Sequence, residues 1–468
     1  MASPRSLALV ALAGAAAATV SVAVRAAPTD APAVASRGSD EVPAGRPPTP
    51  PESSLRVVTL AEVERTADAQ QPQILVARAV THGAEAQAEQ VRAPLLPQLD
   101  GSAAYTRQTG NFVARPGVLP STTASPNWSV STSFDYWNFG VTGTQLIYDF
   151  GQAWQRYRAA EATVDADRSM EGATRLQIRF AARRAYFAAR ATRELVGVAR
   201  DTVGQQERHL QQVQAFVQVG TQPEIALAQQ RAALANARVQ LITAQNNYET
   251  AKAQLNQAAG IPGGTDYDVG DEVLPAVDDE EQPLEVLVSK AIAARPELAT
   301  IARQRGAQEA ILSSVRGGYG PTISAAAGAS EQGTSLDRLV PNWNAGVLLN
   351  WPFFQGGLTR GQVHQAEAGL ESLDAQRTLE ELQVRLEVDS ARLGLRAAKA
   401  TIGAAQEAET NAREQLRLAD QRYATGVGGI LELNDAQLAY TAAAAQIVQA
   451  HYSLATARAQ LLGALGRR

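Results

Sequence analysis

A short stretch in the second half of the chain, residues 343–351, alternates apolar side chains with mostly polar or small ones. A period of two is typical of a β-strand with one apolar face. Aromatic rings at both ends of that face are typical of a strand that faces lipid, although a half-buried strand in a soluble sheet would alternate in the same way. The apolar face of the predicted strand comprises Trp343, Ala345, Val347, Leu349 and Trp351.

The segment that begins with this strand occurs twice, because residues 137–260 return as residues 343–466, a constant 206 positions later. Both copies open with the motif Trp-Asn-x-Gly-Val, at Trp137 and at Trp343. Self-similarity at a fixed spacing indicates that one structural unit was used twice. The first copy should therefore also begin with a strand, which we predict at about residues 128–148.

The repeat extends towards the N-terminus at a larger spacing, because Pro72 corresponds to Pro296, 224 positions later. The first half therefore contains extra residues, and the Gly, Pro, Ser and Thr at 108–127 predict that they form a loop. Weaker strands, with small residues on both faces, are predicted before this loop and at the matching place in the second half, at about residues 98–107 and 322–331.

Helices of unusual length follow the strands. Residues 151–219 and 357–425 contain no proline, so roughly 68 residues at 1.5 Å each would span on the order of 100 Å. The second helix carries two apolar stripes about half a turn apart, which suits a helix packed between neighbours on both sides better than a two-stranded coiled coil. One stripe comprises Leu379, Leu382, Leu386 and Leu393, and the other comprises Val388, Leu395 and Ile402.

Two glycines, Gly220 and Gly426, end the long helices, and the chain turns back there in shorter ones. Each returning helix would stack end to end with a short helix that precedes the strands. An acidic segment rich in Gly and Pro, residues 261–283, joins the two halves, and we expect it to cross the helices as an equatorial linker. The short helices are predicted at residues 72–92, 224–259, 296–315 and 431–465.

The N-terminus has the pattern of an export signal. Arg5 precedes an apolar run that ends in small residues at Ala26, which is typical of a secretory signal peptide over residues 1–26. The run is rich in Ala and shorter than the ~20 apolar residues of a membrane span, which disfavours a retained anchor. Residues 27–59 are rich in Pro and Ala and predict a flexible leader.

Composition narrows the class of protein. The chain has no cysteine, which excludes disulfides, thiolate metal sites and a lipidated cysteine. Aromatic residues make up 5% of the chain and the net charge is −5, which favours long packed helices over an enzyme core and argues against nucleic acid as a partner. No apolar run after the signal is long enough for a membrane-spanning helix, so any contact with a membrane would be made by strands.

The sequence shows no constellation of catalytic or metal-binding residues. The linker aspartates Asp266, Asp268 and Asp271 resemble a calcium loop only faintly, and an exposed acidic belt is the better interpretation. No Ser or Thr lies in a nucleophile motif. The histidines lack metal-ligand spacing, and we predict no catalytic residue, metal site or cofactor. The histidines are His82, His209, His364 and His451.

Three short motifs lie in a fixed order in the second half, at residues 294–298, 351–357 and 422–437. They read Ala-Arg-Pro-Glu-Leu, Trp-Pro-Phe-Phe-Gln-Gly-Gly, and Arg-Tyr-Ala-Thr-Gly followed by Leu-Glu-Leu-Asn-Asp-Ala-Gln. Each motif alone is modest, but their order and spacing in a doubled chain are specific. Over essentially all of the sequence after residue 60, the chain resembles the TolC-type outer-membrane efflux proteins.

The resemblance implies a mainly α-helical fold with membrane β-strands. Each chain of a homotrimer would give four strands to a 12-stranded barrel in the outer membrane and its helices to a tunnel in the periplasm. The function implied is a passive export duct of a tripartite efflux or type I secretion system, carrying small molecules or proteins. The implied partners are a periplasmic adaptor (membrane fusion) protein, an inner-membrane transporter and outer-membrane lipid, which Trp137, Trp343, Val347, Leu349 and Trp351 would face.

In that family the helix turns lie at the periplasmic tip, where the tunnel narrows to a gate. The resemblance assigns Glu432 and Asp435 to the gate, with Tyr423 holding it closed, although a solvated acidic pair near a helix N-terminus would have the same spacing. Ala226 and a glycine at 428 depart from the family pattern, so a closing network would be built differently here. The turns assigned to adaptor contact contain Gly220, Gly426 and Gly428.

The chain is therefore predicted to have two structural repeats that follow a signal peptide and a leader and are joined by a linker. A periplasmic coiled-coil scaffold is the alternative, which the heptads alone would allow but the strands would not; a secreted enzyme or lectin is disfavoured by the lack of a catalytic constellation. The predicted order is a signal peptide (1–26), a leader (27–59), a first repeat (60–260), a linker (261–283) and a second repeat (284–468).

Overall fold

The structure is a computed structural model that describes residues 56–109, 133–278 and 280–467, and these form one compact unit. The predicted signal peptide, the predicted leader up to residue 55 and most of the predicted insertion loop lie outside the described residues. The helices are α1 (Leu60–Gln70), α2 (Pro72–Arg92), α3 (Gln152–Gln218), α4 (Glu224–Ala259), α5 (Leu284–Ala294), α6 (Pro296–Gly317), α7 (Leu358–Ala424) and α8 (Ile430–Ala464). The strands are β1 (Arg56–Val58), β2 (Gln98–Thr109), β3 (Ser133–Tyr148), β4 (Tyr267–Val269), β5 (Thr322–Gly333) and β6 (Val340–Asn350).

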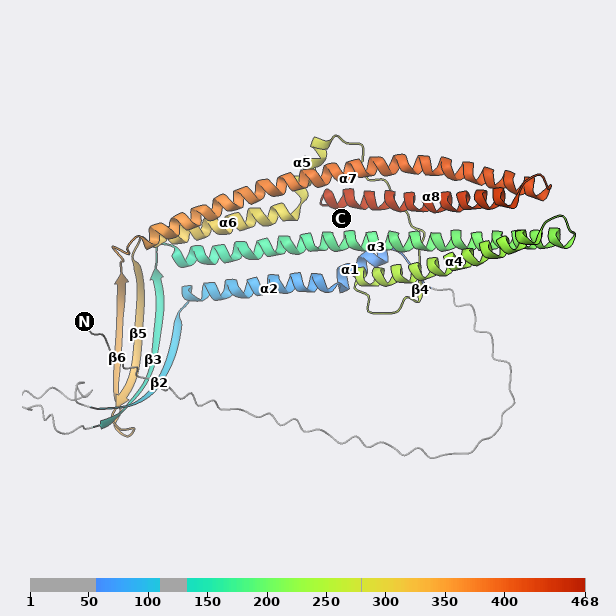
Figure 1. Cartoon of the computed structure of the whole chain (residues 1–468). Coiled ribbons are helices and arrows are strands. Elements are labelled where there is room, and N and C mark those ends of the chain that lie inside the picture. The colour runs from blue at the N-terminus through green and yellow to red at the C-terminus, as the bar shows by residue number, and fades with distance from the viewer. Residues whose placement is uncertain (1–55, 110–132, 279, 468) are drawn as a thin grey trace, which may run out of the picture. The chain divides into compact units, whose positions relative to one another are not determined.

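Four strands, in the order β2-β3-β5-β6, form one antiparallel sheet at one end of the long helices (Figure 1). Trp137 of β3 lies opposite Tyr105 of β2, and Trp343 of β6 lies opposite Ala329 of β5. Ala329 in turn lies opposite Val141 of β3. Because directly opposed residues of antiparallel strands project to the same face, both tryptophans lie on one face of the sheet.

The other face of the sheet carries mostly polar or small residues, together with Leu146 and Leu348. Trp351, which was predicted to end the apolar face of the last strand, lies outside β6, and that prediction was wrong. β6 ends at Asn350 because Pro352 has no amide hydrogen to continue the ladder. The polar face carries Asn138, Thr142, Thr144, Ser324, Ser330, Asn342, Asn344 and Asn350.

The longest elements are α3 and α7, each with 67 residues. As Figure 1 shows, α2 and α6 run beside their halves nearer the sheet, and α4 and α8 fold back along the halves farther from it. α6 and α8 lie between α3 and α7, whereas α2 and α4 lie on the other side of α3. No helix in the part of the chain that the structure describes is both long and apolar enough to cross a membrane.

A set of short elements, which we call the belt, crosses the helices near their middle and comprises α1, β1, β4, α5 and the linker. β1 pairs in parallel with β4, and Thr59 caps α1 by accepting from the amide of Glu62 at 3.3 Å. The leader, predicted to be flexible up to residue 59, is therefore structured from Arg56, because these bonds hold it. The buried Tyr186 of α3 donates to the carbonyl of Gly270 at 3.1 Å and anchors the linker.

The two apolar stripes predicted on α7 have different environments within the chain. Val388 and Leu395 are buried against α5 and α8, in the same cluster as Leu287 and Leu461. The other stripe has no such cover, since each of its leucines is more than half exposed. One stripe thus builds the core of the chain, and the other is left on its side. The exposed stripe comprises Leu379, Leu382, Leu386 and Leu393.

Candidate functional site

The two helical hairpins, α3–α4 and α7–α8, end in matching turns at Gly220 and Gly426, and we call this end of the molecule the tip. Both glycines have a φ of +78°, in the left-handed region that favours glycine. In the second turn, the amides of Val427 and Gly428 donate to the carbonyl of Arg422 at 3.0 and 2.9 Å. A helix that ends in this way satisfies its last carbonyls while the chain reverses direction.

The glycine at position 428, noted above as a departure from the family pattern, fits the tightness of this turn. A Cβ added to Gly428 would lie 3.0 Å from the Cβ of Arg422 and 3.1 Å from its carbonyl carbon. The atoms that would have to move include the backbone of Arg422. A basic residue at position 428 would therefore require the turn to shift.

Glu432 and Asp435 lie in the first two turns of α8, and both side chains are exposed. The neighbouring Leu433 and Ala436 are buried on the side that faces the hairpin core. The guanidinium of Arg422 pairs with the Glu432 carboxylate at 3.1 Å and links the end of α7 to the start of α8. The two carboxylates thus share one side of the helix, and one has a cationic partner that the sequence did not identify.

Tyr423 is buried between the two hairpins, away from these carboxylates. Its ring packs edge-on against Phe216 of α3, with 5.8 Å between the centroids, in an apolar cluster with Ala226 and Leu433. Burial raises the pKa of the Tyr423 phenol, and its hydroxyl has no hydrogen-bond partner among the described residues. Within one chain Tyr423 therefore joins α3 to α7 by packing, and the alanine at 226 keeps this contact apolar.

Polar contacts that the sequence did not identify join the hairpins away from the turns. His209 Nε2 lies 3.5 Å from Asp420 Oδ1 across the α3–α7 interface. Burial lowers the pKa of His209, and the Asp420 charge offsets part of that effect. Thr202 and Thr441 lie 3.2 Å apart, oxygen to oxygen, and join α3 to α8. Helical periodicity gave no signal for these residues, because isolated polar positions on an apolar face do not change the period.

Two of the three linker aspartates, Asp268 and Asp271, hold the belt to α3. Asp268 and Asp271 both pair with Arg193 of α3, at 3.0 and 2.6 Å. Within residues 56–109, 133–278 and 280–467, no three His, Cys, Asp or Glu side chains are placed to hold a metal ion. These aspartates therefore fix the linker to the long helix.

The remaining predicted site residues lie at the sheet end of the molecule (Figure 1), and all of them except Trp351 lie on the apolar face of the sheet. Trp137 packs against Tyr105, with 4.5 Å between ring centroids. Trp343 is 82% exposed, and Val347 and Leu349 are each more than half exposed. The predicted residues thus fall into two groups, one at the sheet and one at the tip, separated by the length of α3 and α7.

Comparison with known proteins places this architecture in a family. The family model described as outer membrane efflux protein matches residues 64–261 and 287–467. The outer membrane efflux protein BepC of Brucella suis is 25% identical over 365 residues, which cover 76% of this chain and 78% of that protein. The toluene efflux pump outer membrane protein TtgF of Pseudomonas putida is 26% identical over 393 residues, covering 80% and 76%.

The fold is shared with solved channels. The CmeC outer membrane channel of Campylobacter jejuni superposes with a TM-score of 0.74 at 20% identity, covering 87% of this chain and 85% of that chain. The resemblance inferred from the sequence motifs is thereby confirmed. The family model spans both repeats, and the predicted fold class, with two structural repeats and a four-stranded antiparallel sheet, is confirmed as well. The chain belongs to the outer membrane efflux protein family, and it is an efflux channel of the outer membrane rather than an enzyme.

Proposed function

We propose that three copies of this chain close into one export duct, with a twelve-stranded barrel in the outer membrane and a helical tunnel in the periplasm. The duct receives its cargo from an inner-membrane transporter through a periplasmic adaptor protein. Export removes the signal peptide at residues 1–26, and the linker at 261–283 joins the repeats at 60–260 and 284–468. The observation that carries the proposal is that both lateral edges of the described chain lack partners.

The edge strands of the sheet support closure into a ring. β2 has 12 residues and β6 has 11, and within the described residues each pairs on one side only. An edge exposes unpaired N–H and C=O groups, each of which costs several kcal/mol inside a bilayer. Pairing β6 of one copy with β2 of the next removes both edges, and a closed ring leaves none. Three copies give twelve strands. The interior of an eight-stranded barrel is filled by side chains, so a duct needs a barrel with more strands than that.

The helices have matching apolar sides. The leucine stripe of α7 lies on one side of the chain, and exposed aliphatic residues of α2 and α4 lie on the other. Burying a leucine contributes roughly 1.5–3 kcal/mol, so the four leucines of the stripe favour association strongly. The aliphatic residues on the opposite side are Leu75, Val76, Val80, Val239 and Ile242.

The tip supplies the gate of the proposed duct. Three copies of Glu432 and Asp435 around the axis attract cations and repel one another. Arg422 neutralises part of this charge, since it pairs with Glu432. The packing of Tyr423 on Phe216 ties the second hairpin to the first, so opening requires α7 to move against α3.

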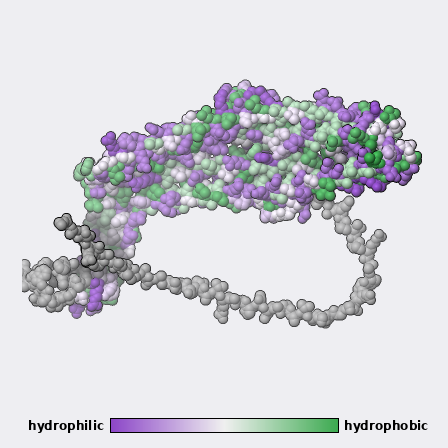
Figure 2. Space-filling view, viewed as in Figure 1, coloured by the Kyte–Doolittle hydropathy of each residue, from purple (hydrophilic) through white to green (hydrophobic). Residues whose placement is uncertain are grey.

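The turns at the tip form the adaptor contact. Gly220, Gly426 and Gly428 keep them compact, and aliphatic side chains around them are exposed. Figure 2 shows hydrophobic residues among hydrophilic ones at the end of the hairpins far from the sheet. Exposed apolar patches of this kind favour a protein partner. The exposed aliphatic residues are Val219, Ile225, Val427, Leu431 and Leu438.

The oligomeric state in detergent tests the assembly. We expect the purified mature protein to have the mass of three chains by light scattering. The double substitution Leu379→Glu with Leu386→Glu should give monomers, because it places charge in the buried contact. Gln376→Glu, at an exposed position of α7 outside the leucine stripe, should leave the trimer intact. A mature protein that stays soluble and monomeric without detergent would contradict the duct and favour the coiled-coil scaffold.

Ion selectivity in planar bilayers tests the gate. Replacing Glu432 by Gln and Asp435 by Asn should lower the preference for cations and weaken block by the trivalent hexamminecobalt ion. Unchanged selectivity in channels that still form would remove both carboxylates from the pore.

A further inference from the structure

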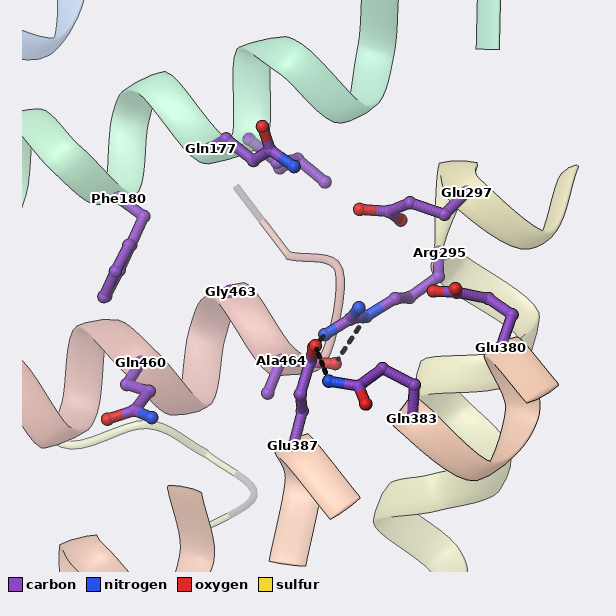
Figure 3. A pocket seen from close by; sticks show the side chains of 11 residues that line it. Gln177, Phe180, Arg295, Glu297, Glu380, Gln383, Glu387, Gln460, Gly463 and Ala464 are labelled. Atoms are coloured by element: carbon purple, nitrogen blue, oxygen red, sulfur yellow. Dashed lines mark hydrogen bonds and ion pairs between the residues drawn. The ribbon is translucent and has the colours of Figure 1, made fainter. Parts of the chain in front are cut away.

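A cavity of about 600 Å³ lies where the start of α6 meets the end of α8, between α3 and α7 (Figure 3). Carboxylates converge on it from Glu297 of α6 and from Glu380 and Glu387 of α7. The buried guanidinium of Arg295, the residue before α6, lies among them. A concave site of this size, with a few convergent polar groups, is large enough for a small molecule.

The cavity lies on the face of the helical layer away from the belt. On α3, Gln177 lines the cavity, while Arg179, about 200° further round the helix, pairs with Asp68 of α1. On α7, Gln383 lines the cavity, while Arg385, again about 200° further round, pairs with α5. With the belt on the outside of the proposed tube, the cavity faces its lumen.

Only one of the three carboxylates, Glu387, has an ion-pair partner in the part of the chain that the structure describes. Arg295 forms an ion pair with Glu387, which also accepts from Gln383 Nε2 at 2.9 Å. Glu297 and Glu380 have no hydrogen bond or ion pair with another described residue, and Oε2 of Glu297 is fully buried. Burial raises the pKa of Glu380, the Glu297 charge adds to that effect, and the nearby Arg295 charge offsets part of it. A cation in the cavity would be attracted by both carboxylates, since neither has an ion-pair partner among the described residues.

The first repeat has the same helix junction without these charges. Gln71 stands where the second repeat has Arg295, and its amide caps α4 by donating to the carbonyl of Gln257 at 3.1 Å. Arg295 caps α8 in the same way, by donating to the carbonyl of Ala464 at 3.1 Å. The junction therefore forms with a neutral capping residue.

The equivalent cavity in the first repeat is also smaller. It has a volume of about 360 Å³ and no charged residue among those that line it. Because the junction folds there without carboxylates, Glu297 and Glu380 are not needed for the packing of the helices. At the positions that correspond to Glu297, Glu380 and Glu387, the first repeat has Gln73, Thr174 and Ala181.

We propose that the cavity of the second repeat binds an amphiphilic organic cation, with its ammonium group between Glu297 and Glu380 and its apolar part on Leu176 and Phe180. Both apolar side chains line the cavity, and a ring such as Phe180 attracts cations over its face. The apolar side chains beside the carboxylates favour an organic cation as the ligand. This inference rests on the proposed duct and names a class of cargo that binds midway along it.

Binding of ethidium, a planar aromatic cation, tests the site. The purified mature protein in detergent should bind one ethidium per chain, measured by fluorescence anisotropy. Glu297→Gln and Glu380→Gln should each weaken binding at least five-fold, because each removes one of the two charges. The matched control is Gln73→Ala in the cavity of the first repeat, which should leave the affinity unchanged.

Channel recordings separate the site from the duct. If the wild-type protein forms channels in bilayers but the Glu297 and Glu380 variants bind ethidium as tightly as the wild type, the proposed site is overturned and the proposed duct is not. The same holds if wild-type protein forms channels but binds no ethidium. A wild-type protein that forms neither trimers nor channels would overturn the duct, and with it the placement of the site in a lumen.

Discussion

The belt and the tip differ in how fully their buried polar side chains are bonded, although Arg190 Nε at the belt also lacks a partner among the described residues. At the belt, Glu280 of the linker accepts from Arg458 of α8 at 2.9 Å and pairs with Lys399 of α7 at 2.8 Å. Lys252 of α4 is buried, donates to the carbonyl of Thr265 at 2.8 Å and lies over the ring of Tyr248. The buried charges of Glu280 and Lys252 therefore have partners, and they fasten the linker to three helices.

At the tip, polar groups are buried with their bonding incomplete. Gln230 donates to Gln206 at 2.5 Å, yet its own carbonyl oxygen accepts nothing from the described residues. A buried polar atom without a partner costs about 1–3 kcal/mol. The packing of the hairpins at the tip is therefore weakly held compared with the belt. Atoms without a partner occur at the tip in Gln205, His209, Gln230, Tyr423, Asn434 and Gln437.

The difference indicates where the proposed duct moves. An element that must rearrange is drawn from the less stable part of a structure. The belt fixes the long helices at their middle, and the hairpins beyond it can change their packing without disturbing the sheet.

Glu280→Ala should have the largest effect on stability, because it leaves Arg458 and Lys399 without their buried partner. Breaking a buried ion pair costs about 3–5 kcal/mol, so we expect a clear fall in the temperature of thermal unfolding, followed by circular dichroism. Glu281→Ala is the matched control, since Glu281 also pairs with Lys399 but is 82% exposed. Equal shifts for the two variants would contradict the special role of the belt.

Two tyrosine substitutions compare the regions directly. Tyr186→Phe at the belt leaves the Gly270 carbonyl without its donor and should cost about 1–3 kcal/mol in the free energy of unfolding. Tyr423→Phe at the tip removes a hydroxyl that has no described partner, so the free energy should stay the same or rise slightly. Denaturant titration measures both, and a larger loss for Tyr423→Phe would reverse the comparison.

Acid should loosen the tip before the belt. The pKa of His209 is lowered in the folded protein, chiefly by burial, while Asp420 opposes this shift and Arg208 adds to it. The unfolded state therefore binds more protons, and the stability contributed by neutral His209 is lost as pH falls below about 6.5. Amide hydrogen exchange at pH 7.5 and 5.5 should show faster opening of residues 205–217 and 412–424 at the lower pH.

The matched variants for the acid effect are His209→Gln and His82→Gln. The first should flatten the pH dependence at the tip, because it removes the buried titrating group. The second changes an exposed histidine of α2 and should leave the dependence as it is. If the His209→Gln variant shows the same pH dependence of exchange at the tip as the wild type, other titrating groups cause the effect.

Arg422→Gln should lower stability only slightly. Its pair with Glu432 is half exposed, and such pairs contribute about 0.2–1 kcal/mol. The same change frees one carboxylate of the proposed gate, so bilayer recordings should show a higher cation preference. A variant with lowered thermal stability and unchanged selectivity would mean that Arg422 is a structural residue like those of the belt.

Sequence periodicity and the repeat together predicted the long helices and the four strands of the sheet closely, but they missed α1 and α5. The spacing of 224 residues that related Pro72 to Pro296 also relates Leu60 to Leu284, the first residues of these two helices. Both helices are only 11 residues long, so apolar periodicity alone gave little signal. Extending the repeat by one more helix would have found them.

The site could be predicted only in part. The spacing of Glu432 and Asp435 placed both carboxylates on one side of α8, as the structure has them. The burial of Tyr423 and the contact between Arg295 and Glu387 depend on which faces of four helices meet. Spacing along a single helix does not determine how neighbouring helices are rotated about their axes, so these contacts came only from the structure.

The equal length of α3 and α7 constrains how this chain can change over evolution. An insertion of one heptad into α3 alone would carry its turn about 10 Å beyond that of α7 and separate Phe216 from Tyr423. A lengthening that keeps the turns level has to occur in both copies at once, and by the same number of residues. The distance from the sheet to the tip is therefore encoded twice in the sequence, once in each repeat, and the two copies have to change together.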